Sequence, residues 1–157
     1  KTYNGAIGVT TDTTAVVTIL EEFESIGYET GVIATSTITH ATPASFYAHV
    51  PFRKMEEEIA LALTNSNVDF FAGGGRKFFN KRSDDINLLT SLNTNGFIVE
   101  TQTLSLETTM NKTNRYAYLL ADEGMPKMIE GRGSFHHAKV VLGHPMFQTN
   151  FMLTFWA

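Results

Sequence analysis

Hydrophobic and polar positions along the chain follow two patterns, short apolar runs and helical repeats. Runs rich in β-branched and aromatic residues predict strands at residues 31–36, 68–72, 97–99 and 116–120. Between these runs, apolar residues recur every three or four positions, which predicts amphipathic helices. Helices that alternate with short strands at this spacing indicate βαβ units, so we predict an α/β fold with a largely parallel sheet.

The first two helices are predicted from their caps as well as from their repeats. Asp12 or Thr13 caps the first helix, and Gly27 follows its last turn as the C′ residue. Thr42 is the expected N-cap of a second helix over residues 43–50. The first residue of that helix is a proline, whose missing N–H costs nothing at this position.

Two more helices are expected further along the chain. The third helix leaves three glutamates, residues 56–58, exposed, because its apolar positions fall on the opposite face. The fourth helix begins at Asp84-Asp85 and stops at residues 95–96, an Asn-Gly pair. We find no internal repeat and no linker, which favours a single domain.

Composition narrows the class of protein. A chain of 157 residues suits one domain, and its net charge of −4 gives no basic footprint for nucleic acid. No apolar run reaches the ~18 residues that a membrane span needs, and the first residues lack the pattern of a signal peptide. The absence of cysteine excludes disulfides and thiolate metal sites.

Residues 31–53 hold the candidate chemistry, because a strand, a polar turn and a helix start follow one another there. The turn carries His40 and Thr42 at the carboxyl end of the strand, where open α/β sheets bind ligands. A threonine hydroxyl suits one position of a magnesium octahedron, and the planar fork of Arg53 can bind two phosphate oxygens. Local pattern alone nevertheless favours a capping threonine, a hydrogen-bonded loop histidine and a solvated arginine.

Three other motifs are weaker candidates. Residues 73–77, GGGRK, follow a strand but lack the GK[ST] and GxGxxG patterns of phosphate loops, so we expect a tight exit from the strand. The pair His136-His137 and the later His144 have no carboxylate at ligand spacing. Residues 12–14, Asp-Thr-Thr, resemble a nucleophile turn only loosely and are interpreted as a helix cap.

Three long segments resemble the alkaline phosphatase family in their order and spacing. They are KTYNGAIGV at the start, ATSTITHATPASFYAHV followed by Arg53, and DFFAGGGRKFF with NLL after it. The resemblance runs from Lys1 to about Gly133 and includes EGMPKMIEGRG. It implies a three-layer sandwich with a mostly parallel sheet, which is incomplete in this chain.

The resemblance also implies a function. Alkaline phosphatases hydrolyse phosphate monoesters through a phosphoserine intermediate, with two zinc ions and one magnesium ion as cofactors. By the family's motif, Thr42 is a magnesium ligand, His40 reaches the magnesium through water, and Arg53 binds the substrate phosphate. These groups suit phosphoryl transfer, in which positioning and charge stabilisation do most of the catalysis. A homodimer and a periplasmic or secreted location are implied as well.

The chain departs from the family pattern at both ends. The nucleophilic serine is expected upstream of Lys1 and the zinc ligands downstream of this chain, so we treat residues 1–157 as one partial domain that is inactive alone. Residues 134–157 diverge from the family, with Thr154-Phe155-Trp156 where a glutamate is expected. A truncated or frame-shifted reading of a longer gene is one hypothesis for this tail.

Two other functions stay open. A phosphodiesterase or sulfatase relative would share the fold, although we do not expect it to share THATPASFYAH with an arginine at this spacing. A catalytically dead module that binds phosphate or a metal would keep the sheet and a weak cation site. Substrate specificity separates the first alternative, and binding of phosphate without zinc separates the second.

Overall fold

A parallel sheet forms the centre of the computed structural model, which describes residues 2–102, 104, 110, 111, 113–127, 129 and 151–156. Within these residues, five strands follow the order β3-β4-β2-β1-β5, and each neighbouring pair is parallel. The strands are β1 (Glu29–Thr37), β2 (Phe70–Gly74), β3 (Phe97–Glu100), β4 (Arg115–Ala121) and β5 (Phe151–Trp156). The predicted α/β fold with a largely parallel sheet is confirmed.

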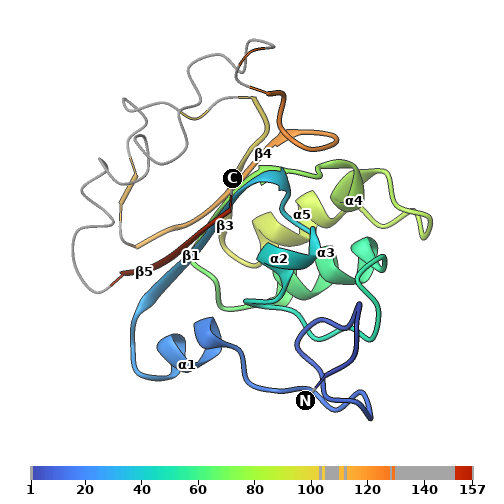
Figure 1. Ribbon diagram of the computed structural model, residues 1–157. Coiled ribbons are helices and arrows are strands. Elements are labelled where there is room, and N and C mark those ends of the chain that lie inside the picture. Colours follow the sequence, from blue (N-terminus) through green and yellow to red (C-terminus); the bar gives the residue numbers. More distant parts are fainter. Residues whose placement is uncertain are drawn as a thin grey trace.

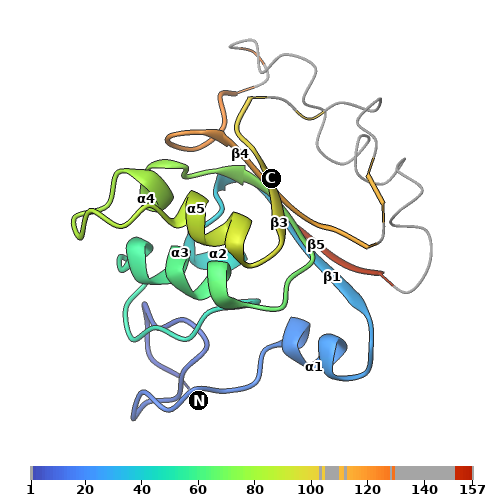
Figure 2. The same ribbon diagram turned by 180° about the vertical axis from the view of Figure 1, so that it is seen from behind.

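Short helices accompany the sheet. They are α1 (Ile19–Ser25), α2 (Ala41–Ala44), α3 (Glu56–Asn65), α4 (Lys77–Asn80) and α5 (Leu88–Thr94). Helices α2 to α5 lie together on one face of the sheet, whereas α1 lies apart from them near the start of β1 (Figure 1). The view from behind shows the same separation (Figure 2). None of the helices in the described part of the chain is long and apolar enough to cross a membrane.

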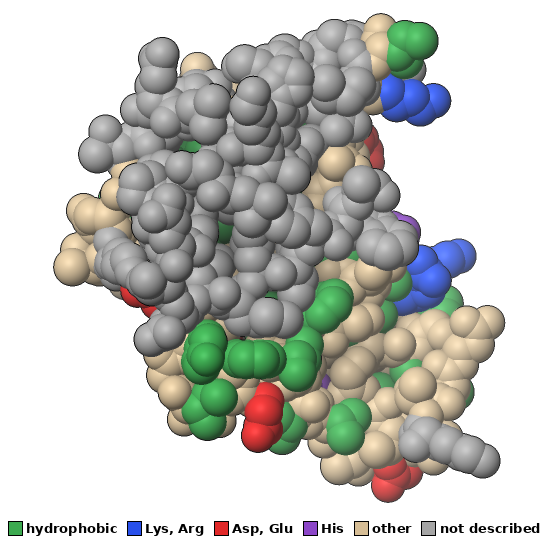
Figure 3. Space-filling view, turned by 60° about the vertical axis from the view of Figure 1, so that its left-hand side comes forward, with side chains coloured by type: hydrophobic (Ala, Val, Ile, Leu, Met, Phe, Trp, Pro, Cys, Tyr) green, Lys and Arg blue, Asp and Glu red, His purple; other side chains and the backbone are tan. Residues whose placement is uncertain are grey.

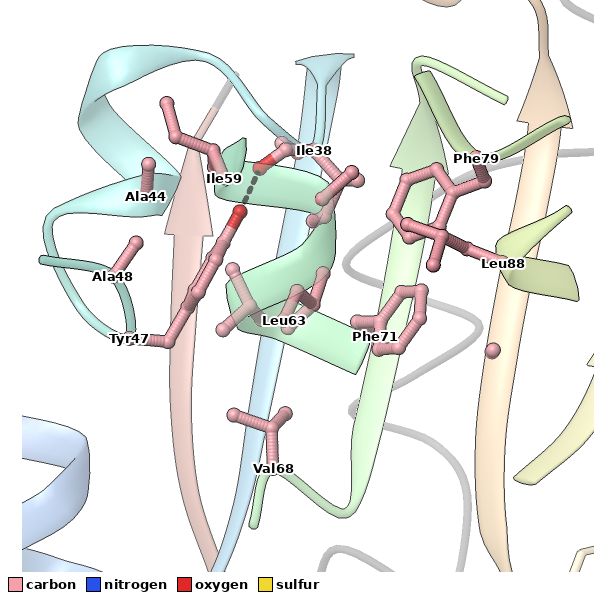
Figure 4. Close-up of a cluster of buried hydrophobic side chains, with 14 of the residues drawn as sticks. Ile38, Ala44, Tyr47, Ala48, Ile59, Leu63, Val68, Phe71, Phe79 and Leu88 are labelled. Carbon is pink, nitrogen blue, oxygen red and sulfur yellow. Dashed lines mark hydrogen bonds between the residues drawn. The ribbon is translucent and has the colours of Figure 1, made fainter. Parts of the chain in front are cut away.

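Strand side chains alternate between two cores, as the period of two in a strand requires. On β1, Val32 and Ala34 pack with the helices, and Ile33 between them packs on the opposite face. Among the described residues, more side chains belong to the helical-side core, part of which is drawn in Figure 4. Its members from the helices and the turns beside them include Ile38, Ala44, Tyr47, Ile59, Leu63, Phe79 and Leu88.

The predicted start of the first helix at Asp12 is wrong. Helix α1 begins at Ile19, because Thr18 and Glu21 form a capping box in which each side chain accepts a backbone hydrogen bond from the other residue. Residues 10–14 form a tight turn instead, closed by a backbone hydrogen bond between its end residues. The interpretation of residues 12–14 as a helix cap is therefore wrong as well.

The fourth helix also begins later than predicted. Asn87 caps α5 by accepting a hydrogen bond from the backbone of Leu89. Asp85 has a φ of +58°, which is incompatible with a helical residue, and Asp84 pairs with Arg82. The acidic pair therefore belongs to the loop that precedes the helix.

The glutamates of helix α3 are less exposed than the pattern predicts. Glu58 is exposed, but Glu56 and Glu57 are half-buried and accept hydrogen bonds from other segments. Gly73 and Gly74 extend the second strand beyond its predicted end, and Gly75 makes the expected tight exit with a φ of +93°. Residues 134–150 of the divergent tail lie outside the described residues, and residues 151–156 of the tail form β5 beside β1.

Candidate functional site

The candidate site begins where β1 ends. The strand stops at Thr37, and a turn over residues 37–40 leads into α2, whose N-cap residue is His40. Thr42 lies inside the first turn of α2, so its predicted role as the N-cap is wrong. This polar turn at the carboxyl end of a parallel strand is nevertheless where the sequence predicts the site.

Helix α2 is shorter than predicted and ends at Ala44 instead of Val50. Long-range contacts draw the following residues away from the helical path. Val50 pairs with Ile7 through two backbone hydrogen bonds of 3.0 and 2.9 Å, and the hydroxyl of Tyr47 donates to the carbonyl of Ile38. Local helical spacing in this segment therefore gives way to contacts with the start of the chain and with the turn.

His40 and Arg53 meet beside this turn. The Nη2 atom of Arg53 lies 3.5 Å from Nε2 of His40. The backbone N–H of Arg53 donates to the carbonyl of Gly5 at 2.7 Å, which fixes the start of an exposed side chain. The structure thus brings together two of the three predicted site residues, and Thr42 follows one of them in the same helical turn.

The second ring nitrogen of His40 is buried without a partner. Among the residues that the structure describes, Nδ1 of His40 has no hydrogen-bond partner. A buried polar atom in this situation usually binds an ordered water or an ion that the protein atoms do not show. The arrangement suits a histidine that acts on a metal through water.

The described residues supply only part of a metal site. They contain no group of three or more His, Cys, Asp or Glu side chains that could hold a metal ion. His40 and Thr42 offer a neutral nitrogen and a neutral oxygen, whereas magnesium in proteins usually also takes carboxylates and water. These two residues therefore fit the edge of a magnesium site and do not form one by themselves.

The cationic residues after β2 are already paired. Arg76 donates to Asp122 at 2.7 Å, and Lys77 donates to Glu123 at 2.6 Å. A Cβ atom on Gly74 would lie 2.0 Å from the carbonyl oxygen of Glu123, so the glycine allows the loop after β4 to pack here. The glycine run serves strand packing, in agreement with the absence of a phosphate-loop motif. The candidates His136, His137 and His144 lie outside the described residues.

A hollow of about 780 Å³ opens at the opposite, amino-terminal edge of the sheet. Glu21, Glu24, His49 and Asp69 line it together with apolar residues that precede α1. Its carboxylates repel a phosphate anion when they are ionised. Burial raises the pKa of Glu24 and of Asp69, so these two carboxyls lose their charge more readily than exposed ones. The carboxyl edge with Arg53 is therefore the better candidate for an anionic substrate.

Sequence reasoning missed the side chains that hold the turn in place. Glu56 accepts hydrogen bonds from the hydroxyls of Thr37 and Thr39, and Tyr47 binds the carbonyl of Ile38. No local pattern distinguishes Glu56 from the two glutamates that follow it. The available signal was the pair Thr37 and Thr39, two polar residues on either side of the apolar Ile38 in the turn.

Comparison with known proteins gives one consistent answer. Residues 1–138 match the family model described as alkaline phosphatase. The chain is 36% identical to alkaline phosphatase 4 of Bacillus subtilis over 136 residues, which cover 83% of this chain and 29% of the relative. It is 37% identical to alkaline phosphatase 3 of the same organism, with the same coverage of both chains.

Solved structures show the same similarity. The alkaline phosphatase of the Antarctic bacterium TAB5 matches with a TM-score of 0.86 and 42% identity over 99% of this chain and 46% of that chain. A histidine-to-aspartate mutant of that enzyme, with Mg bound in its M3 site, matches with a TM-score of 0.87. The chain thus spans less than half of these structures and about 29% of the curated relatives.

Proposed function

Because this chain belongs to the alkaline phosphatase family, we propose that it supplies the magnesium-side and phosphate-binding residues of a metal-dependent phosphomonoesterase. The observation that carries the proposal is the 3.5 Å contact between Arg53 and His40, next to Thr42 and at the carboxyl end of β1. Three residues that the family motif assigns to one site thus come from one strand-to-helix turn and the segment after it.

Magnesium is the cofactor that these residues suit best. The hydroxyl of Thr42 is the proposed ligand, and His40 acts through a water molecule. The buried, unpartnered Nδ1 of His40 supports this arrangement. The Mg bound in a histidine-to-aspartate mutant of the TAB5 enzyme supports the choice of metal alone. Two zinc ions, with ligands that the family pattern puts outside this chain, supply Lewis-acid chemistry when bound.

Arg53 is the proposed phosphate-binding residue. Its guanidinium is exposed and can donate two parallel hydrogen bonds to one phosphate group. The neighbouring ring of His40 limits where the guanidinium can go before substrate binds. Phosphoryl transfer gains from such a group because negative charge on the phosphate oxygens must be held in one place as the bond breaks.

The remaining parts of the proposal concern the whole enzyme. A phosphoserine intermediate requires a serine nucleophile, and we propose none in this chain. The intact enzyme is proposed to be a homodimer and to work in the periplasm or outside the cell. These proposals rest on family membership.

Substrate specificity tests the proposed function. The full-length protein, expressed from its complete reading frame, is expected to hydrolyse p-nitrophenyl phosphate, to lose activity with a chelator and to regain it with Zn²⁺ and Mg²⁺. A preference for bis-p-nitrophenyl phosphate or p-nitrophenyl sulfate would instead indicate a phosphodiesterase or a sulfatase. Tight binding of phosphate without zinc, and without turnover, would indicate a catalytically dead binding module.

The isolated 157 residues give a second test. We expect no turnover from this chain alone, because the proposal assigns neither a nucleophile nor a zinc ligand to it. Hydrolysis of p-nitrophenyl phosphate that depends on added zinc would contradict this assignment.

A further inference from the structure

We propose that Glu56 is a positioning residue for the site, because its carboxylate fixes the turn that carries His40 and Thr42. Glu56 is the first residue of α3 and touches none of the reacting groups. The inference rests on the proposed function, since positioning matters for catalysis only if this turn binds magnesium and phosphate.

Two threonine hydroxyls converge on one oxygen of Glu56. Oγ1 of Thr37 donates to Oε2 at 3.1 Å, and Oγ1 of Thr39 donates to the same atom at 2.7 Å. Thr39 is 0% exposed, so water cannot replace the carboxylate as its partner. Hydrogen bonds to an ionised carboxylate are stronger than neutral ones, and an unpaired buried hydroxyl is costly.

Neutral hydrogen bonds hold the rest of the turn. The N–H of Ile38 donates to the carbonyl of Gly74 at 2.9 Å, and the N–H of His40 donates to the carbonyl of Thr37 at 3.0 Å. The hydroxyl of Tyr47 donates to the carbonyl of Ile38 at 2.7 Å (Figure 4). Each residue of the turn is therefore tied to the sheet, to α3 or to the segment after α2, and Glu56 adds a charge to this set.

Tyr47 keeps its proton in this environment. Burial, followed by the negative charge of Glu56, raises the pKa of Tyr47 well above its ordinary value. The phenol therefore stays a hydrogen-bond donor in alkaline solution. As a result, the hydrogen bond from Tyr47 to the carbonyl of Ile38 persists in alkaline solution.

The position of Glu56 also links the two halves of the site. Arg53 precedes it by less than one helical turn, and the N–H of Met55 donates to the carbonyl of Phe52 at 3.0 Å across that short segment. A carboxylate that ties the start of α3 to Thr39 therefore fixes the segment with Arg53 relative to the turn with His40.

Glu57 offers a matched control. It lies in the same first turn of α3 and carries the same charge, but its carboxylate accepts hydrogen bonds from the backbone and hydroxyl of Ser83 at 2.9 and 2.7 Å. The favourable interaction with the helix N-terminus is shared by both glutamates. Of these two glutamates, Glu56 is the one whose side chain accepts hydrogen bonds from the turn.

The experiment compares Glu56→Gln with Glu57→Gln in the full-length protein. Loss of a residue that orients metal ligands typically lowers metal affinity at least tenfold, so we expect the Mg²⁺ concentration for half-maximal turnover to rise about tenfold in Glu56→Gln. KM is expected to change less than kcat at low Mg²⁺. Amide hydrogen exchange at Ile38 and His40 in the metal-free protein is expected to speed up in Glu56→Gln and to stay unchanged in Glu57→Gln.

Variants of Thr39, combined with Glu56→Gln in a double-mutant cycle, give a second test of the inference if Glu56→Gln alone folds poorly. Thr39→Val removes the donor and Thr39→Ser keeps it, so only the valine variant is expected to weaken Mg²⁺ activation. Adding Glu56→Gln to Thr39→Val is expected to change the half-maximal Mg²⁺ concentration by less than about twofold, because coupled residues are not additive. Independent, additive effects would overturn the inference.

The outcomes separate this inference from the proposed function. Wild-type protein without Mg²⁺-dependent turnover contradicts the proposed function, while amide exchange at Ile38 and His40 still reports whether Glu56 holds the turn. Active, Mg²⁺-dependent wild-type protein in which Glu56→Gln behaves like Glu57→Gln by both measurements overturns the positioning role alone.

Discussion

The carboxyl and amino ends of the parallel strands, called here the carboxyl edge and the amino edge of the sheet, are built in different ways. At the carboxyl edge, the turn over residues 37–40 is bound by β2, by α3 and by Tyr47, and Ile38 in its middle is 0% exposed. At the amino edge, α1 has seven residues and buries Leu20 alone. The candidate site is thus held by several long-range contacts, whereas α1 combines its own cap with one buried leucine and a partly exposed contact to His49.

Exposed apolar side chains mark the amino edge. Val17 is 72% exposed and Ile26 is 64% exposed, on either side of α1. Figure 3 shows hydrophobic side chains gathered on this lower part of the molecular surface. Substitutions at the two edges should therefore differ most where a buried residue of the turn is compared with an exposed residue beside α1.

The largest effect is expected from Ile38→Ala. Deleting most of a fully buried isoleucine typically costs about 2–5 kcal/mol, because it leaves a cavity in a packed core. Ile26→Ala is the control and is expected to stay within about 0.5 kcal/mol of the wild type, as exposed substitutions usually do. Chemical denaturation of the full-length variants measures both free energies of unfolding, and equal losses would remove the contrast between the edges.

Arg53→Ala should have the next largest effect, on binding instead of stability. Loss of a charge-assisted contact to phosphate is expected to cost about 1.5–3 kcal/mol, which is roughly a ten- to hundredfold rise in the inhibition constant of inorganic phosphate. Lys54→Ala, one exposed residue further on, is the charge-matched control. Unchanged inhibition by phosphate in Arg53→Ala would show that the guanidinium does not bind substrate.

A smaller effect is expected at the cap of α1. Thr18→Ala removes the side chain that accepts from the backbone of Glu21 and should cost about 1 kcal/mol of stability. Thr13→Ala, at the cap that the sequence pattern favoured, should stay within about 0.5 kcal/mol of the wild type. Thermal denaturation shows which of the two variants loses more stability. A larger loss for Thr13→Ala would support the longer helix that the sequence pattern predicts.

The smallest effect is the pH dependence of the contact between His49 and α1. Burial by itself lowers the pKa of His49. Hydrogen bonds to the carbonyl of Gly8 and to Glu21 outweigh this effect and raise the pKa above its ordinary value of 6.5. A raised folded-state pKa means that the contribution to stability is complete below pH 6.5 and is lost as the pH rises through the folded-state value.

His49→Gln should remove this pH dependence. Both side chains of the pair are partly exposed, so the difference in unfolding free energy should stay below about 1 kcal/mol. Denaturation curves between weakly acidic and alkaline pH measure it. A stability difference between wild type and His49→Gln that grows as the pH rises would contradict the assigned direction.

Much of the sheet could be predicted from the sequence. The apolar runs in β1, β3 and β4 predict those strands to within a few residues. In β1 and β4 the run is apolar because a central parallel strand is buried on both faces, whereas the edge strand β3 leaves Ile98 exposed. The helix starts were harder to predict. Apolar spacing extends back to Val16, but the capping box at Thr18 sets the true start of α1.

The site could be predicted only in part. Family resemblance singled out His40, Thr42 and Arg53, while local pattern favoured ordinary structural roles for all three. The contact between His40 and Arg53 and the convergence of Thr37 and Thr39 on a glutamate join residues that lie 13 to 19 positions apart in the chain. Sequence spacing carries no direct information about such contacts.

A crystal structure of the full-length protein with Mg²⁺ and phosphate tests the central claim most directly. The account predicts phosphate bound to both terminal nitrogens of Arg53, and Mg²⁺ about 2.1 Å from Oγ1 of Thr42. Phosphate and Mg²⁺ bound elsewhere, such as in the acidic hollow beside α1, with Arg53 and Thr42 contacting neither, would contradict it.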